Sequence, residues 1–463
     1  MIPCLIPSRV SSSLFCLVVL AALLSYPAPA PAEFPILLKE IIIECNRKAL
    51  DESLADGSYR GEAGILRIRP EPARSLGLKV CEDQDYREAV HLLEQAEKDL
   101  KMAKIALCSQ RKETFPDQHA RRVMEHMLAY QKTRHLSRER FACYHGKVNR
   151  GNDDRLDETR CQKVLSGLLA ESLGNTGRNL RDALGYFFNK CQGAANNTDH
   201  LMPSNVAFVN EVFHRYARRA PPGFRDSLDL DSRKIPWDAS PSRHWREVME
   251  KDGFPYASHL AAALKRHPDL GKWVDPMLFA ALMKRESRFD PLAVSQVGAA
   301  GLTQIMPRTA LELGMKGIFI PSYYDRALSF MEKEKAKRRE ALETLFDITG
   351  GDGLQRAGRA RDLMQASLGY RLQRERLLAR YKRDLLRDGK DSRLDPAVSI
   401  EYGLRYFAGL MKDHQGDISL ALASYNAGSH RVREYRGIPP FRETVRFRNR
   451  VLGFYGDYVG RLE

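Results

Sequence analysis

The sequence predicts a mostly α-helical protein, made of two helical domains joined by a linker. The chain has 463 residues, more than one ordinary core needs, so more than one domain is expected. Apolar residues make up 43% and charged residues 29% of the chain, a composition typical of globular proteins. Apolar residues recur three and four positions apart in most of the chain from residue 36 onwards, which is the period of a helix.

Residues 1–32 have the layout of a secretory signal peptide. Arg9 precedes a purely apolar stretch, 14–24, which is too short to span a bilayer comfortably. Small residues follow in an Ala-x-Ala pattern that ends at Ala32, where cleavage is expected. We therefore expect an exported protein of the periplasm or cell envelope, with an uncleaved membrane anchor as the alternative.

Residues 33–220 are expected to form a helical, cysteine-containing N-terminal domain whose role the sequence does not reveal. Residues 91–107 show the helical spacing clearly, and joints rich in Asn and Gly separate the helices. An even number of cysteines in an oxidising compartment predicts structural disulfides, with their pairing left open. The six cysteines outside the signal peptide are Cys45, Cys81, Cys108, Cys143, Cys161 and Cys191. The histidines of this domain lack metal-ligand spacing, and no metal or organic cofactor is expected.

Residues 221–243 are rich in Pro and Asp and cannot sustain a helix, so they are expected to be the linker. The region 244–463 then forms the second domain. Inside it, residues 326–393 contain two long charged helical stretches around a Gly-rich break, which predicts an inserted helical hairpin. The hairpin is either a solvated decoration or an arm that binds the cell wall or a partner.

The chain is strongly basic, with a formal net charge of +15. The predicted hairpin alone has 18 Lys and Arg against 11 Asp and Glu. Such a balance favours an anionic partner. Export makes nucleic acid the least favoured partner, whereas an acidic polymer outside the membrane, such as a bacterial cell wall with its carboxylates, fits well.

Glu286 is the candidate catalytic residue. Asp275 and Pro276 are typical of a helix start, and Asp290-Pro291 ends the helix, so Glu286 is expected on its last turn. The following segment, 295–307, combines Gly, Ser and Gln with apolar residues, and its glycines are expected to allow close approach of a ligand. A carboxyl group in such surroundings would have a raised pKa and could act as a general acid.

Three blocks of sequence, in this order, carry a specific resemblance. The first is Glu286-Ser287-x-Phe289-x-Pro291 with Ser295 and the segment 298–310, which reads Gly-Ala-x-Gly-Leu-x-Gln-Ile-Met-Pro-x-Thr-Ala. The second, 421–428, contains Tyr-Asn-Ala-Gly, and the third, 438–444, reads Ile-Pro-Pro-Phe-x-Glu-Thr. Together they resemble the catalytic domain of the soluble lytic transglycosylases, over about 250–463 without the hairpin.

This resemblance implies a lysozyme-like helical domain that cleaves peptidoglycan between N-acetylmuramic acid and N-acetylglucosamine. Glu286 would protonate the glycosidic oxygen and then, as a carboxylate, accept the proton of the muramoyl 6-hydroxyl, which closes a 1,6-anhydro ring. The matching positions imply that the sugar site is lined by Ser295, Gln304, Met306 and Tyr425, with Asn426 nearer to bracing a turn.

One departure from the family concerns Phe447, which stands where the family commonly has a tyrosine with its hydroxyl close to the catalytic acid. Two other functions stay open: a goose-lysozyme-like hydrolase that uses the same Glu286, and a non-catalytic wall-binding or assembly protein, which Phe447 and the unusual insertion favour. An envelope assembly or secretion complex is a possible partner, through residues 33–220 or the hairpin 326–393.

Overall fold

The computed structural model describes residues 36–81, 83–109, 117–176, 179–194, 199–219 and 244–460. The predicted signal peptide, 1–32, and the predicted linker, 221–243, lie outside the described residues. The described residues are mainly helical and contain isolated β-bridges but no strand, which confirms the mostly α-helical fold class. No helix in the described part of the chain is both long and apolar enough to cross a membrane.

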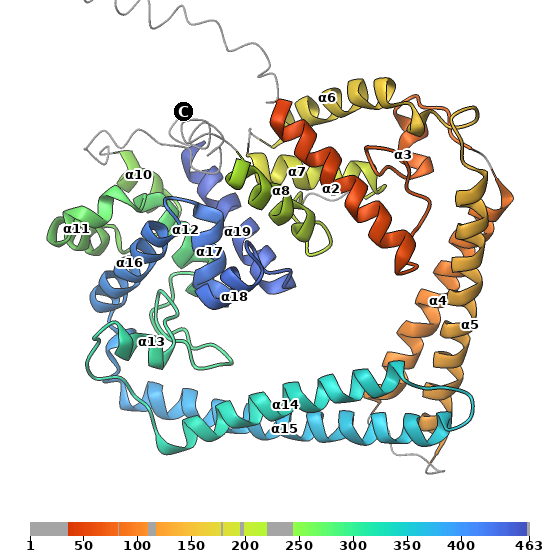
Figure 1. The fold of residues 1–463 in the computed structure, drawn as a ribbon. Coiled ribbons are helices and arrows are strands. Elements are labelled where there is room, and N and C mark those ends of the chain that lie inside the picture. Colours follow the sequence, from red (N-terminus) through yellow and green to blue (C-terminus); the bar gives the residue numbers. More distant parts are fainter. Residues whose placement is uncertain are drawn as a thin grey trace, which may run out of the picture.

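The N-terminal half contains seven α-helices and one short 3-10 helix among its described residues (Figure 1). These elements are α2 (Ile36–Ala55), α3 (Pro70–Ser75), α4 (Gln84–Cys108), α5 (Gln118–Lys147), η1 (Asp154–Leu156), α6 (Glu158–Asn175), α7 (Leu180–Cys191) and α8 (Val206–Arg219). Helices α4 and α5 form a long antiparallel hairpin that projects from the rest of this half (Figure 1).

The C-terminal half is built around α12, whose residues 276–283 are all buried. Its elements are α10 (His244–Lys251), α11 (Ala257–Arg266), η3 (Pro268–Lys272), α12 (Pro276–Ser287), α13 (Pro307–Glu312), α14 (Ser322–Phe346), α15 (Gly353–Asp388), η4 (Ser392–Leu394), α16 (Pro396–Asp413), α17 (Ile418–Ala427), α18 (Ser429–Glu434) and α19 (Arg442–Val459). Helix α12 packs on α19 and α10, in a core that also takes apolar residues from α11, α16 and α17.

The two halves repeat one order of elements. Helices α3 and α13 have six residues and a proline in their first turn, α4 and α14 both have 25 residues, and α6 and α16 both have 18. Each half has one long hairpin, α4/α5 or α14/α15, at the same place in this order. The inserted hairpin is therefore a feature of both halves.

A buried arginine makes the same bonds in each half. In the C-terminal half, Arg393 pairs with Asp391 at 2.8 Å. Its guanidinium group also donates to the carbonyl oxygens of Gly298 and Ile305, at 3.0 and 3.1 Å, and to the hydroxyl of Tyr381 at 2.7 Å. These bonds tie the start of α16 to the loop that precedes α13 and to the base of the hairpin.

The N-terminal half contains the equivalent set around Arg155. This arginine pairs with Asp153 at 2.7 Å and donates to the hydroxyl of Tyr144 at 2.7 Å. It also donates to the carbonyl oxygens of Gly61 and Ile68, at 2.7 and 3.0 Å. Since each equivalent partner lies 237 or 238 positions earlier in the chain, the two halves share one tertiary fold and not only one order of helices.

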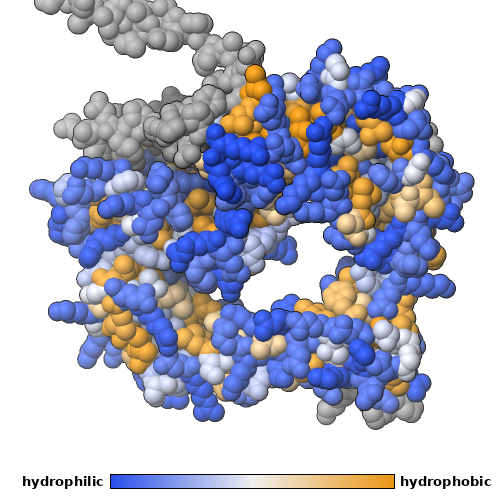
Figure 2. All heavy atoms as spheres, in the orientation of Figure 1, coloured by the Kyte–Doolittle hydropathy of each residue, from blue (hydrophilic) through white to orange (hydrophobic). Residues whose placement is uncertain are grey.

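The halves meet at two places and enclose a ring. At one place the ends of the two hairpins pack together (Figure 1). The apolar residues buried there are Ala103, Ala106, Leu107, Ala120, Val123 and Met127 from the N-terminal half and Ala341, Leu345, Ile348, Ala357, Ala360 and Met364 from the C-terminal half. The space-filling view shows an opening through the ring (Figure 2). The hairpin end is thus covered by protein, so it is neither a solvated decoration nor a free arm.

The second contact joins α7 and α8 to the region from α17 to α19, and its bonds are reciprocal. Asn210 donates from its amide to the carbonyl of Ile438 at 2.8 Å, and Asn449 donates to the carbonyl of Leu201 at 2.9 Å. The exchange of these asparagine bonds is the mark of an isologous, two-fold interface. Ion pairs add to the same contact: Arg181 pairs with Asp417, which caps α17, and Arg448 bonds to Asp182 and to Asn179, which caps α7.

The prediction of disulfides was wrong, because all six cysteines of the described residues are free thiols. Cys45, Cys161 and Cys191 are buried in the apolar core of the N-terminal half, where each acts as a small apolar side chain. Burial raises the pKa of the Cys45 and Cys161 thiols to about 11. Cys108 and Cys143 are exposed on different helices. Cys45, Cys161 and Cys191 therefore help to fill this core.

Candidate active site

Glu286 lies on the last turn of α12, as the sequence predicts. The helix begins at Pro276, and the side chain of Asp275 caps it by accepting from the N–H of Met277 at 2.7 Å. The hydroxyl of Tyr455 in α19 donates to the same carboxyl group at 2.9 Å. The start of α12 is thus fixed to α19, while Glu286 itself is half-buried at the other end of the helix.

The backbone around Glu286 adopts conformations that non-glycine residues rarely take. Arg288 ends α12 with a φ of 54°, and Phe289 follows with a φ of 65°. Gln304, in the facing loop, has a φ of 48°. The N–H of Phe289 donates to the hydroxyl of Ser287 at 3.1 Å, which supports this turn. Left-handed residues cost free energy and gather at functional sites, so this concentration marks the site.

Burial raises the pKa of Glu286 from 4.5 to about 8. The negative charge of Glu443 acts in the same direction, whereas the neighbouring Arg285 opposes it. Arg285 lies over the ring of Phe447, with 5.5 Å between the guanidinium carbon and the ring centroid. Glu286 can therefore hold its proton at neutral pH, which is what a general acid requires.

The glycines of the facing loop make room for the protein itself. A Cβ atom on Gly301 would lie 1.8 Å from the carbonyl oxygen of Arg393, and one on Gly298 would lie 2.7 Å from the ring of Tyr324. Both glycines also have positive φ, of 80° and 92°. The interpretation that they free the backbone for a ligand is therefore wrong, since the space is taken by the buried arginine network.

Two of the predicted sugar-site residues shape this loop. The hydroxyl of Ser295 accepts from the N–H groups of Val297 and Ala299, at 3.3 and 3.0 Å. The amide nitrogen of Gln304 donates to the carbonyls of Ala293 and Gly301, at 2.9 and 2.8 Å. These bonds leave the hydroxyl hydrogen of Ser295 and the amide oxygen of Gln304 as the groups that can face a ligand.

Tyr425 lies in α17. Burial is the main cause that raises the pKa of its phenol, and the nearby carboxylate of Glu286 raises this pKa further. Its hydroxyl donates to the carbonyl of Thr303 at 2.6 Å. Tyr406 packs against its ring, with centroids 5.2 Å apart. Phe447 stacks parallel to Tyr425, at 6.5 Å and 3°, and is buried in the core.

The remaining predicted residues take different places. Met306 is half-buried and precedes α13 as its N-cap residue. Asn426 accepts from the hydroxyl of Thr444 at 2.9 Å, a bond that braces the end of α17 against α19. Sequence reasoning did not single out Tyr406, Arg285 or Glu443, although Glu443 stands next to Thr444 in the third sequence block.

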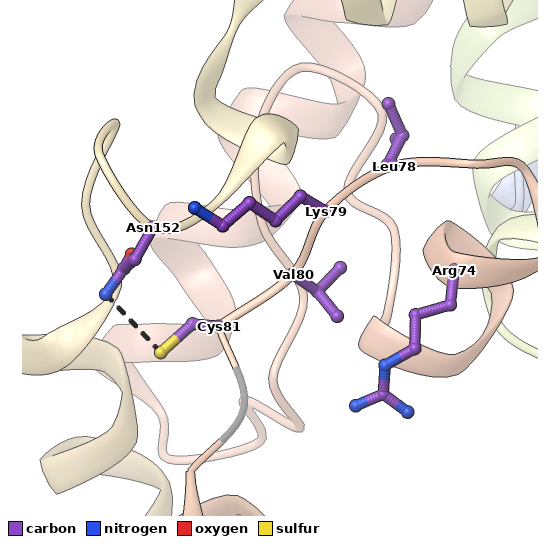
Figure 3. Close-up of a pocket in the computed structure, with 6 residues that line it drawn as sticks. All are labelled: Arg74, Leu78, Lys79, Val80, Cys81 and Asn152. Atoms are coloured by element: carbon purple, nitrogen blue, oxygen red, sulfur yellow. Dashed lines mark hydrogen bonds between the residues drawn. The ribbon is translucent and has the colours of Figure 1, made fainter.

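No metal-binding cluster of His, Cys, Asp and Glu occurs among the described residues. One surface pocket, of about 520 Å³, lies in the N-terminal half and away from Glu286 (Figure 3). Its lining residues are Arg74, Leu78, Lys79, Val80, Cys81 and Asn152. The amide of Asn152 points to the sulfur of Cys81 at 3.6 Å, and nothing in this lining resembles the surroundings of Glu286.

The C-terminal half is thus a helical domain in which one desolvated glutamate ends a buried helix beside a looped segment, which is consistent with a lysozyme-like fold. Residues 266–328 and 374–446 match the family described as the Transglycosylase SLT domain. The C-terminal half of the chain therefore contains a transglycosylase SLT domain, and the resemblance to the soluble lytic transglycosylases is confirmed. The unmatched residues between the two segments belong to the hairpin α14/α15.

Among solved structures, the chain is similar to an inactive mutant of the lytic transglycosylase Slt from Pseudomonas aeruginosa. The sequences are 17% identical, and the TM-score is 0.25. The match covers 97% of this chain and 61% of the Slt chain, so the protein spans less than two thirds of the length of that enzyme.

Proposed function

We propose that the protein is a peptidoglycan lytic transglycosylase of the periplasm or cell envelope. The observation that carries the proposal is the half-buried carboxyl group of Glu286, with a pKa of about 8, inside a transglycosylase SLT domain. The proposed location rests on the signal-peptide pattern of residues 1–32, and the net charge of +15 suits a wall that carries carboxylates.

In the proposed reaction, protonated Glu286 donates its proton to the glycosidic oxygen between N-acetylmuramic acid and N-acetylglucosamine. The bond to C1 of the muramoyl sugar breaks, and the leaving sugar keeps the proton. The Glu286 carboxylate then accepts the proton of the muramoyl 6-hydroxyl, whose oxygen bonds to C1 and forms the 1,6-anhydro ring. One carboxyl group serves both steps, and no water is consumed.

Ser295, Gln304, Met306 and Tyr425 are proposed to line the sugar site. The hydroxyl hydrogen of Tyr425 is engaged by Thr303, so towards Glu286 the oxygen can only accept a hydrogen bond. Such a bond favours the protonated carboxyl group, which is the form needed first.

The second candidate is a hydrolase, because an exposed carboxylate, Glu443, lies near enough to Glu286 to raise its pKa. A second carboxylate on the other side of the bond is what ordinary glycoside hydrolysis uses. Mass spectrometry of digested wall separates the candidates: anhydro-muramoyl ends are expected, and reducing muramic ends would assign hydrolysis.

The test of Glu286 is the substitution Glu286→Gln. Glutamine has nearly the same shape but can neither donate nor accept the catalytic proton, so turnover is expected to fall by about 10²–10⁴-fold. The thermal unfolding midpoint serves as the control for an intact fold. Activity within a few-fold of the wild type would place the chemistry on another residue.

A further inference from the structure

The N-terminal half carries a counterpart of Glu286. Glu52 lies in the last turn of α2, which holds the place of α12 in the repeated order of elements. A buried serine follows each glutamate, Ser53 in one half and Ser287 in the other. Both serine hydroxyls donate to a carbonyl of the preceding helical turn, at 2.8 and 3.1 Å.

The facing loop also has its counterpart. Ser58 precedes Gly61 by three residues, as Ser295 precedes Gly298. Arg67 takes the place of Gln304, three residues after the second glycine of the loop, and both have a φ of 48°. The N-terminal half therefore repeats the backbone of the site and not only the surrounding helices.

The chemistry of the repeated site is different. The side chain of Glu52 is 64% exposed and lies 3.6 Å from Lys48, whereas Glu286 is half-buried. Phe187 holds the position of Tyr425, eight residues after the helix cap, and brings no hydroxyl group. A buried proton donor is therefore missing at this place.

Two arginines lie at the loop of this site. The Nε atom of Arg67 and one terminal nitrogen of Arg134 are enclosed and make no hydrogen bond within the described residues. The other terminal nitrogen of Arg134 donates to the carbonyl of Gly57 at 3.0 Å, which places Arg134 beside the loop between Glu52 and Arg67. Burial is the largest cause that lowers the pKa of both guanidinium groups, and the carboxylates of Glu62, Glu52 and Asp56 partly offset it at Arg67. A bound anion would supply hydrogen bonds that the enclosed nitrogen atoms lack.

We propose that the N-terminal half is a second glycan site, which binds a carboxylate-bearing segment of peptidoglycan through Arg67 and Arg134 and does not cleave it. The inference rests on the proposed function, because it takes its ligand from the substrate of Glu286. The end of α2 and the loop between α12 and α13 both border the central opening of the ring (Figures 1 and 2). A glycan strand of peptidoglycan bound at the end of α2 would therefore lie close to the loop that faces Glu286.

The test measures retention of the full-length Glu286→Gln protein on purified, insoluble peptidoglycan. In that background, Arg67→Ala and Arg134→Ala are each expected to weaken binding by about 5- to 50-fold, because a charge-assisted pair to a carboxylate is lost. Arg67→Gln is a second variant at this position. It introduces the residue that the other half has at the equivalent position, Gln304, with the same φ of 48°. Arg121→Ala, at an exposed position of α5, is the matched control and is expected to change nothing.

Two further measurements test which group of the ligand is bound and whether binding at the N-terminal half is separate from cleavage at Glu286. Amidation of the peptidoglycan carboxylates is expected to weaken binding to the Glu286→Gln protein. The same treatment is expected to leave binding to the protein with the added Arg67→Ala substitution unchanged. With Glu286 intact, the arginine variants are expected to turn over short soluble fragments within two-fold of the wild type.

Unchanged retention in both arginine variants would overturn the inference. So would cleavage that survives Glu286→Gln and disappears in the double variant with Glu52→Gln, since the second site would then be catalytic. A wild-type protein that neither binds nor cleaves peptidoglycan would instead refute the proposed function, so the two failures are distinguishable.

Discussion

At the residue scale, the buried carboxyl group of Glu286 makes the stability of the fold depend on pH. Its pKa is about 8 in the folded chain and 4.5 as a free side chain, so folding favours the protonated form. The stabilisation is complete below pH 4.5 and is lost as the pH rises through 8. Glu286→Gln stays neutral throughout and is expected to gain about 1–3 kcal/mol over the wild type between pH 5 and pH 9.

This gain in stability is smaller than the pKa shift would give at about 1.4 kcal/mol per pKa unit. The reason is that Glu286 is partly exposed, so solvent screens its charge. Chemical denaturation of the two proteins at pH 5 and pH 9 measures the difference. Equal differences at the two pH values would mean that Glu286 is not desolvated. In the wild type, the activity on soluble fragments is expected to fall above pH 8 for the same reason.

At the element scale, the loops that precede α3 and α13 depend on glycine. A Cβ atom on Gly64 or Gly301 would lie 1.8 Å from a carbonyl oxygen, of Arg155 and Arg393 respectively. Both glycines also have positive φ. Gly64→Ala and Gly301→Ala are each expected to destabilise the fold by about 3 kcal/mol or more, because backbone must move in a buried network.

The matched control is Gly453→Ala, within α19, where an added Cβ would meet nothing within 4 Å. Alanine is the better helix former, so this change is expected to be neutral or stabilising by up to about 1 kcal/mol. Thermal unfolding of the three variants measures the contrast. A mild effect of Gly64→Ala beside a severe one of Gly301→Ala would show that the two networks are not equivalent.

The sequence predicts the local elements of the site well. Asp275 and Pro276 predict where α12 begins, because capping is a property of adjacent residues. The mixture of Ser, Gln and apolar residues after Glu286 predicts the direction in which its pKa shifts. The glycines were misinterpreted, because the atom that each one faces comes from Arg393 or Tyr324, far along the chain.

The repeat was not predicted, for a physical reason. It is carried by spaced residues, such as the glycines at 61 and 64 with Ile68, whose partners in the fold lie tens of residues away. A short match of this kind carries little signal until the bonds of Arg155 and Arg393 show that the positions are equivalent. Helical period alone describes both halves equally well and reveals no relation between them.

At the scale of the whole molecule, the ring closes through two pseudo-symmetric contacts. Bonds from both halves are reciprocal at the α7/α8 contact, while the hairpin ends join mainly through apolar side chains. The contact of the hairpin ends is therefore the one that a single buried charge can open. It lies far along α14 and α15 from the residues around Glu286, so the apolar clusters outside the hairpins can persist when the hairpin ends separate.

Leu345→Asp tests this closure, because it buries an unpaired charge among the apolar residues of the hairpin ends, where Leu345 is fully buried. The hairpins are expected to part, which raises the radius of gyration in small-angle X-ray scattering and exposes the hairpin ends to proteases. Leu372→Asp, on the same hairpin but 50% exposed, is the matched control and should leave the ring closed.

Turnover of short soluble fragments should persist in both variants, since the core around α12 is separate. Retention on insoluble wall should weaken in Leu345→Asp alone, because a strand can no longer reach the Arg67 site and Glu286 in one fixed geometry. An unchanged radius of gyration in Leu345→Asp would show that the contact of α7 and α8 with the C-terminal half is enough to hold the ring closed.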